Sequence, residues 1–221
     1  MRFIVLTGLT GSGKSDMLCR LATAGEQVID LEALAAHRGS SFGRIGITRP
    51  QPSQASFDAQ LHDALEGIDP DRPVWLEDEG PHIGPLWLPR ELTGAIRDAA
   101  TVELVSLLEE RVRRLVATYG RADPAELIEA TQRIRRRLGN ARADRIISHF
   151  HAGHPDQAIR VLLKYFDEGY VVRSASDART ELPAHDRPAL LIKPQMSTRP
   201  MPRDTRHASR TALEQAGDLA V

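Results

Sequence analysis

The sequence of 221 residues has little of several residue types that define specialised protein classes. Its single cysteine, Cys19, excludes an internal disulfide and a cysteine-based zinc cluster, and it agrees with a reducing compartment. No apolar run reaches the ~18 residues of a transmembrane helix, and the N-terminal residues do not have the pattern of a signal peptide. We therefore expect a cytoplasmic protein without membrane contact, in which Cys19 is a small core residue rather than a reactive thiol.

Neither sign of charge predominates overall, because 29 basic and 30 acidic residues leave a formal net charge of -1. The distribution along the chain is uneven, however. Residues 111–145 contain ten arginines and four carboxylates, so this segment carries a net charge of +6 and the remainder carries -7. Positive charge concentrated in this way favours a polyanionic partner such as RNA.

A phosphate-binding motif stands near the start of the chain, in the context that such a motif needs. An apolar run at 3–6 leads into Gly8-Leu9-Thr10-Gly11-Ser12-Gly13-Lys14-Ser15, and a helix-like segment follows. Glycines let backbone amides curl around an anion, and the helix N-terminus adds roughly half a positive charge. Lys14 is predicted to contact the terminal phosphates and Ser15 to ligate Mg²⁺. The predicted phosphate-binding residues are Gly8, Gly11, Ser12, Gly13, Lys14 and Ser15.

Strand and helix patterns alternate along the first 110 residues, which predicts an α/β fold with a doubly wound parallel sheet of the P-loop type. Short apolar runs bounded by turn residues indicate the strands, and apolar residues at helical spacing indicate the helices. Strands are expected at 2–7, 27–31, 73–76 and 101–107, and helices at 14–24, 32–37, 54–65 and 89–99.

The rest of the chain divides into further parts by composition. Residues 111–170 are predicted to form a helical, arginine-rich extension, with breaks at Gly139 and Gly153. The segment 171–192 is expected to form a terminal hairpin, and 193–221 a disordered tail rich in Pro, Arg, Ser and Thr. Within the 1–110 core, the long loop at 38–53 is expected to be functional or mobile.

Carboxylates follow two of the predicted strands. Asp30 lies at the end of the second strand, and Glu77-Asp78-Glu79 follow the third. Ligands of parallel sheets gather at this end of the strands, where a carboxylate beside a phosphate loop holds Mg²⁺ or orients a nucleophile. We predict Glu77 as the main magnesium ligand and catalytic carboxylate, Asp78 as the next candidate and Asp30 as a further ligand. A solvated strand end is the alternative, above all for Glu79.

Further motifs make the chain resemble the tRNA 2-selenouridine synthases over roughly residues 1–170. The glycine loop alone would identify only a superfamily, whereas the later motifs, in this order and spacing, are narrow. These motifs are Val28-Ile29-Asp30-Leu31-Glu32, His37-Arg38-Gly39-Ser40, Gln51-Pro52-Ser53-Gln54 and Val74-Trp75-Leu76-Glu77-Asp78-Glu79.

The resemblance implies a transferase that modifies the wobble uridine in the anticodon region of certain tRNAs. Such enzymes place a geranyl group from geranyl diphosphate on 2-thiouridine and then exchange sulfur for selenium from selenophosphate. The family also has a rhodanese domain with a reactive cysteine before the glycine loop, and Cys19 lies in a different context. We expect either a separate rhodanese-domain protein that completes the enzyme, a chain that performs only the diphosphate-dependent half, or a repurposed relative.

The glycine loop suits this chemistry, because Lys14 and Mg²⁺ would stabilise the charge that develops on a leaving pyrophosphate. ATP or GTP as the ligand stays an open alternative. His37 and Arg38 are candidates for binding the diphosphate or the anticodon phosphates, or they form an ordinary surface pair. Gln51 and Gln54 carry donors and acceptors that suit a base edge.

The arginine cluster Arg135, Arg136 and Arg137 has three interpretations. It contacts RNA phosphates, forms a lid over the diphosphate, or lies on a solvated helix face with ion pairs to Glu126 and Glu129. The density of arginine favours RNA. Two other functions stay open for the chain: a small-molecule kinase or ATPase with the same loop, and a noncatalytic RNA-binding subunit. A metal-competent phosphate loop argues against the second.

Overall fold

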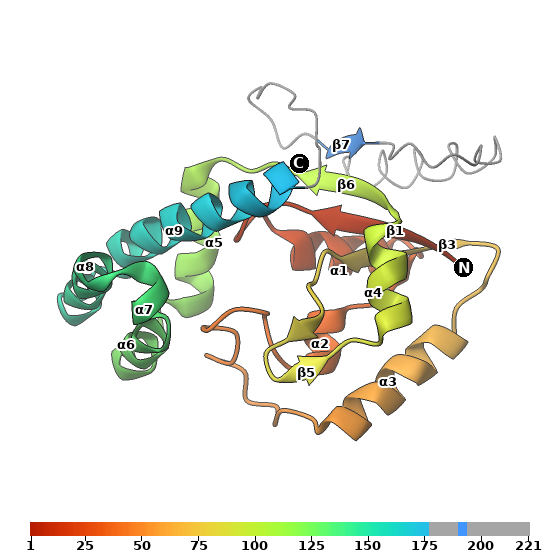
Figure 1. Ribbon diagram of the computed structural model, residues 1–221, viewed down its shortest axis with the longest axis horizontal. Helices are drawn as coiled ribbons and strands as arrows, with labels where there is room; N and C mark the ends of the chain where they lie inside the picture. Colours follow the sequence, from red (N-terminus) through yellow and green to blue (C-terminus); the bar gives the residue numbers. More distant parts are fainter. Residues whose placement is uncertain (177–189, 194–221) are drawn as a thin grey trace.

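The structure, a computed structural model, describes residues 1–176 and 190–193 and confirms the predicted α/β fold (Figure 1). Its main sheet has the strand order β2-β3-β1-β6-β7. The first four of these strands pair in parallel, and β7 pairs with β6 in the antiparallel direction. The strands are β1 (Arg2–Thr7), β2 (Gln27–Val28), β3 (Pro73–Glu77), β6 (Ala100–Leu104) and β7 (Leu190–Lys193).

Helices cover both faces of the sheet, as the doubly wound pattern requires. Helix α1 lies on one face, whereas α2, α3 and α4 lie on the other (Figure 1). Helix α4 begins directly after Pro89, whose fixed φ suits a helix start. The bounds are α1 (Lys14–Thr23), α2 (Leu31–Ala35), α3 (Gln54–Glu66) and α4 (Arg90–Arg97).

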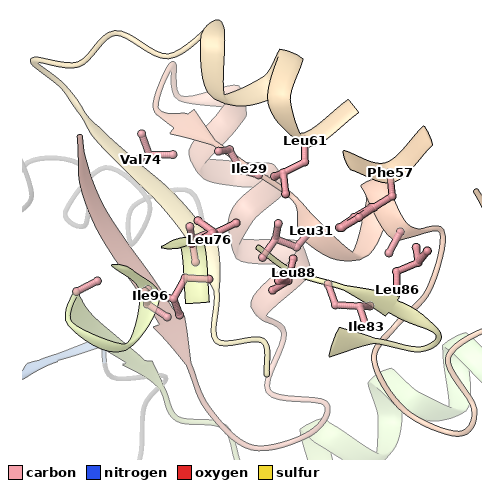
Figure 2. Close-up of a cluster of buried hydrophobic side chains, with 14 residues drawn as sticks. Ile29, Leu31, Phe57, Leu61, Val74, Leu76, Ile83, Leu86, Leu88 and Ile96 are labelled. Atoms are coloured by element: carbon pink, nitrogen blue, oxygen red, sulfur yellow. The ribbon is translucent and has the colours of Figure 1, made fainter. Parts of the chain in front are cut away.

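Two hydrophobic cores result from the alternation of side chains along the central strands. Ile4 and Trp75 point to the α1 face, whereas Val5 and Leu76 point to the opposite face, and all four are buried. Figure 2 shows the second core, in which Leu76 belongs to one cluster with side chains from α2, α3, α4 and a short hairpin. This packing fixes the ends of β1 and β3, where the predicted site lies.

The helical region gathers at one end of the sheet (Figure 1). It is built as expected from successive helices with breaks at Gly139 and Gly153, both of which have positive φ. Val112 of α5 packs against Ile159 and Leu163 of α9, so these two helices lie side by side. The helices are α5 (Leu108–Tyr119), α6 (Pro124–Arg133), α7 (Arg135–Leu138), α8 (Asn140–His151) and α9 (Pro155–Ser176).

The long loop after α2 is anchored rather than loose. Phe42 and Ile45 are buried in the core of the helical region, and Arg44 donates through Nη1 to the Ala36 carbonyl at 2.7 Å. The expectation that this loop is functional or mobile stays a prediction, to which the structure adds these anchoring contacts. Sequence periodicity could not reveal the anchoring, because single apolar residues among glycines and serines have no repeat. The loop joins the α/β core to the helical region.

A short hairpin and a shortened strand distinguish the structure from the sequence prediction. Strands β4 (His82–Ile83) and β5 (Leu86–Trp87) form an antiparallel hairpin in a segment predicted to be loop. Strand β2 ends at Val28 instead of 31, because the Asp30 side chain caps α2 by accepting from the Ala33 amide at 2.8 Å. Cys19 is exposed on α1, so its assignment to the core is also wrong.

The predicted terminal hairpin at 171–192 is wrong in its pairing. Residues 171–172 belong to α9, and the later strand, β7, pairs with β6 of the main sheet. The predicted tail lies outside the described residues from 194 onward. None of the described helices is long and apolar enough to cross a membrane.

Gly84 offers a direct test of how the hairpin is fixed to the core. Its φ is +58°, and a Cβ there would lie 2.6 Å from His37 ring atoms. We expect Gly84→Ala to lower the free energy of unfolding by about 2–4 kcal/mol. Gly94→Ala, in a helix with open space at the Cβ, should raise it by about 0.5–1 kcal/mol. Urea denaturation of both variants measures the difference, and equal effects would contradict this packing.

Candidate diphosphate and metal site

The glycine loop connects β1 to α1 and has the backbone that an anion cradle requires. Gly8, Gly11 and Gly13 all have positive φ, which L side chains rarely adopt. A Cβ at Gly8 would lie 2.5 Å from the Leu104 carbonyl oxygen, so glycine is needed there for space as well. Ser12 is buried, and its Oγ has no hydrogen-bond partner among the described residues. The loop therefore holds a polar group that a phosphate oxygen would satisfy.

Lys14 and Ser15 stand at the start of α1, next to the loop. The Lys14 Nζ donates to the Gly8 carbonyl at 3.1 Å, which places the ammonium group at the beginning of the loop. The Ser15 hydroxyl donates to a carboxylate oxygen of Glu32 at 3.4 Å. Both predicted phosphate-site residues thus lie beside the acidic end of the sheet.

Three glutamates form the acidic group of the site. Glu77 ends β3, Glu79 follows two residues later, and Glu32 lies in the first turn of α2. One carboxylate oxygen from each lies within 4.8 Å of the others. Oxygen donors of this kind suit Mg²⁺, and the buried Glu77 Oε1 has no hydrogen-bond partner among the described residues. The donor set therefore fits the predicted magnesium ion.

The electrostatics of this group favour cation binding. Burial and, to a smaller extent, the neighbouring Glu32 carboxylate raise the pKa of Glu77 to about 8. Burial and the Glu79 carboxylate raise the pKa of Glu32 to about 7, whereas Lys14 opposes the rise at both groups. A divalent cation would replace the protons that these carboxyls otherwise hold near neutral pH.

Two predicted carboxylates are placed differently from their neighbours. The Asp78 side chain is exposed and does not belong to the three-glutamate group, although its amide donates to the Leu6 carbonyl at 2.9 Å. Asp30 caps α2 and lies outside the group as well. Glu79 takes the place predicted for Asp78, because residues two apart on an extended chain point to the same side. Glu32 was not predicted as a ligand. Asp30 was selected because carboxylates at the end of a strand often bind a metal ion, and Glu32 follows the same strand two residues later.

His37 and Arg38 do not form a surface pair. His37 is 7% exposed, and its ring lies between Gly43 and Gly84. A Cβ added to either glycine would lie within 2.6 Å of the ring. Burial and the nearby Arg44 lower the pKa of the His37 imidazole, which disfavours a cationic phosphate contact. Arg38 donates to the Ile45 carbonyl at 2.9 Å and lies over the Tyr119 ring at 5.8 Å. In this structure both residues hold the loop at 38–53.

The two predicted base-reading glutamines bond to the backbone instead. Gln51 donates to the Ala35 carbonyl at 2.6 Å. Gln54 accepts from the Trp87 amide and donates to the Trp87 carbonyl, each at 2.9 Å, and thereby fixes the hairpin strand β5. Their amide groups stabilise the loop and the hairpin, which sequence reasoning could not distinguish from base recognition.

The arginine-rich segment contains two kinds of arginine. Arg135 pairs with Asp144 at 2.7 Å, whereas Arg136 and Arg137 are exposed and pair with no described residue. The i,i+4 pair of Arg133 and Glu129 agrees with the solvated-face interpretation. Five of the ten arginines form ion pairs with described residues: Arg111, Arg114, Arg133, Arg135 and Arg142. The other five are exposed and form no ion pair with a described residue: Arg113, Arg121, Arg136, Arg137 and Arg145.

Two arginines of helix α5 donate hydrogen bonds to the glycine loop. In the sequence they were considered only as part of the positive charge of residues 111–145. Arg111 donates through Nε to the Thr10 carbonyl at 2.8 Å. Arg114 donates through Nη1 to the Gly11 carbonyl at 2.9 Å. No sequence signal connects residues a hundred positions apart, so only the tertiary structure could identify these contacts.

A family model described as the tRNA 2-selenouridine synthase AAA domain matches residues 1–180. The chain belongs to the tRNA 2-selenouridine synthase family. The match includes the glycine loop, the three glutamates and the helical region up to the end of α9. It confirms the family that the sequence motifs indicated.

Curated relatives carry the same family name. The tRNA 2-selenouridine synthase of Cupriavidus necator is 35% identical over 210 residues, covering 80% of this chain and 56% of the relative. That of Cupriavidus pinatubonensis is 41% identical over 129 residues, covering 58% of this chain and 34% of the relative. The chain thus matches between 34% and 56% of the length of these two relatives. The solved structure of TT1252 from Thermus thermophilus is 24% identical in sequence, and the match covers 57% of this chain and 76% of that chain with a TM-score of 0.34.

The raised carboxyl pKa values predict how stability depends on pH in the absence of metal. Because the folded state holds protons on Glu77 and Glu32 that the unfolded chain releases near pH 4.5, the free energy of unfolding should fall as the pH rises toward about 8. In Glu77→Gln, the decrease in the free energy of unfolding with rising pH should be smaller by about 2–4 kcal/mol. Urea denaturation with a chelator at pH 5.5 and 8.5 measures it. Glu126→Gln, which removes an exposed carboxyl, is the control, and an equal change in both variants would contradict the assignment.

Proposed function

We propose that this chain is the diphosphate-binding part of a tRNA-modifying transferase. In this function it binds geranyl diphosphate and transfers the geranyl group to the sulfur of a wobble 2-thiouridine. It also takes part in the exchange of sulfur for selenium from selenophosphate, together with a rhodanese domain. The observation that carries the proposal is the convergence of Lys14, Ser15 and the three glutamates on one glycine loop, in a chain of this family.

The residues of the site suit the departure of pyrophosphate. The loop amides, the N-terminus of α1 and the Lys14 ammonium would bind the diphosphate oxygens and stabilise charge as the allylic carbon–oxygen bond breaks. Glu32, Glu77 and Glu79 would hold Mg²⁺, which would neutralise further charge on the leaving group. The tRNA sulfur forms the new bond to carbon, and pyrophosphate leaves with the electron pair of the broken bond. Positioning and electrostatics are then the main contributions of the protein.

The exposed arginines support tRNA as the partner. Arg136 and Arg137 of α7 and Arg145 of α8 keep their charge available, because none of them pairs with a described carboxylate. They lie on the helical region at the end of the sheet rather than on the elements that carry the glutamates (Figure 1). This separation favours contact with RNA phosphates over a lid on the diphosphate.

Replacement of Lys14 tests the diphosphate site. Lys14→Ala should weaken pyrophosphate binding by about 2 kcal/mol, roughly thirtyfold, because one charge-assisted contact is lost. The circular dichroism spectrum should not change, since among the described residues the Lys14 Nζ donates a hydrogen bond only to the Gly8 carbonyl and is not part of the hydrophobic core. Isothermal titration with magnesium pyrophosphate measures the loss. Arg20→Ala, at an exposed position of the same helix, is the control. Unchanged affinity in Lys14→Ala would exclude a phosphate role for the loop.

A small-molecule kinase with the same loop gives a different result. It would turn over ATP without RNA and would bind a nucleoside triphosphate more tightly than geranyl diphosphate. Competition between these two ligands for the magnesium-loaded protein therefore distinguishes the two functions.

The salt dependence of RNA binding tests the arginine surface. If Arg136, Arg137 and Arg145 contact phosphates, their joint replacement by Gln should lower the slope of log affinity against log salt by about two to three units. The matched control replaces Arg133, Arg135 and Arg142, which removes the same charge from ion-paired side chains. Fluorescence titration of an anticodon stem-loop RNA measures both slopes. An equal reduction in the two triple variants, or none in either, would contradict this surface.

A further inference from the structure

The Arg111 side chain links the glycine loop to the helical region. It is only 4% exposed, and all three of its guanidinium nitrogens are used. Its Nε donates to the Thr10 carbonyl at 2.8 Å, whereas Nη1 and Nη2 donate to the two carboxylate oxygens of Asp167 at 2.9 and 2.7 Å. Asp167 lies on α9 and is 29% exposed. One buried guanidinium therefore joins the loop, α5 and α9.

Neighbouring residues of α5 close the outer side of the loop. A Cβ at Gly11 would lie 3.1 Å from the Leu115 side chain, so α5 packs directly against the loop backbone. Arg114 donates to the Gly11 carbonyl at 2.9 Å and pairs with Asp16 of α1 at 3.6 Å. Two consecutive carbonyls of the loop are thus bound from the same helix.

Hydrogen bonds to these carbonyls constrain the peptide planes of the loop. A peptide whose carbonyl is fixed on the outer side directs the amide of the next residue to the opposite side, because the peptide group is planar and trans. The contact on Thr10 therefore orients the amide of Gly11. The contact on Gly11 orients the amide of Ser12, which donates to the Leu9 carbonyl at 3.0 Å and closes the turn of the loop. The first contact sets the direction of an amide that can bind an anion, and the second fixes the turn that carries it.

We propose that Arg111, held in place by Asp167, is a positioning residue that keeps the glycine loop in its anion-binding conformation. It acts through the Thr10 carbonyl and not on the ligand. The same link makes the loop conformation depend on the packing of α9 against α5, so the helical region that carries the exposed arginines is mechanically connected to the diphosphate site. This inference rests on the proposed function only for the identity of the anion.

The structure offers a matched control for this proposal. Glu109 of α5 accepts from both terminal nitrogens of Arg160 of α9, so this second bidentate ion pair joins the same two helices. Neither residue has a described contact with the glycine loop. Asp167→Asn and Glu109→Gln each remove one negative charge from an α5–α9 pair, but only the first removes support from a residue that binds the loop.

Amide hydrogen exchange on the full chain without ligand measures the loop directly. We expect Asp167→Asn to accelerate exchange in residues 9–13 by about tenfold, and Glu109→Gln to leave exchange there unchanged. Pyrophosphate affinity should fall by about tenfold in Asp167→Asn only. If Asp167→Asn does not fold, Arg111→Lys serves instead, because an ammonium group keeps the charge but cannot bind both Thr10 and Asp167 as a guanidinium does.

The outcomes separate this inference from the proposed function. Unchanged loop exchange in a folded Asp167→Asn or Arg111→Lys variant would overturn the positioning role, as would equal acceleration in Glu109→Gln. If the loop responds as expected while Lys14→Ala binds pyrophosphate normally, the positioning of the loop stands and the proposed diphosphate site fails.

Discussion

The burial of Glu77 at the end of β3 is the constraint on which the arrangement of the site depends. A carboxylate that is 1% exposed is unfavourable in the charged form unless positive charge lies nearby. Its neighbours Glu32 and Asp30 increase this penalty, and Lys14 reduces it only in part. The structure therefore holds, beside its phosphate loop, a group of acids that a divalent cation would stabilise. The energetic cost of burying these acids and the binding of a metal diphosphate that we propose for them have the same origin.

The helical region contacts the glycine loop directly and supports its conformation. Buried Arg111 and partly exposed Arg114 bind loop carbonyls from α5, and Asp167 orients Arg111 from α9. The loop at 38–53 reaches into the same region through Phe42 and Ile45. Two separate segments thus connect the α/β core with the helices. The sequence predicted a domain boundary between residues 110 and 111 from the change in composition. In the structure, side chains from both sides of this boundary pack against each other, so it does not separate two independent units.

Local patterns were sufficient for the sheet and for the glycine loop. The apolar runs at 2–7 and 73–76 became β1 and β3, because a buried parallel strand has a continuous apolar sequence. The context of strand, glycine loop and helix placed Lys14 and Ser15 correctly beside Glu77. The same patterns failed where one side chain changed the backbone course. Asp30 ended β2 by capping α2, and the hairpin of β4 and β5 is too short to show an alternation.

The arginine segment shows why charge counted along a sequence overstates the charge that a partner meets. The pair of Arg133 and Glu129 follows from helical spacing, whereas the pairs of Arg135 with Asp144 and of Arg142 with Glu168 depend on how α7, α8 and α9 pack. Half of the ten arginines are used inside the protein in this way. Arginine therefore serves two purposes here, since its planar group with several donors can join structural elements or bind phosphates. Which arginines keep their charge exposed is a property of the tertiary structure and not of the net charge of +6.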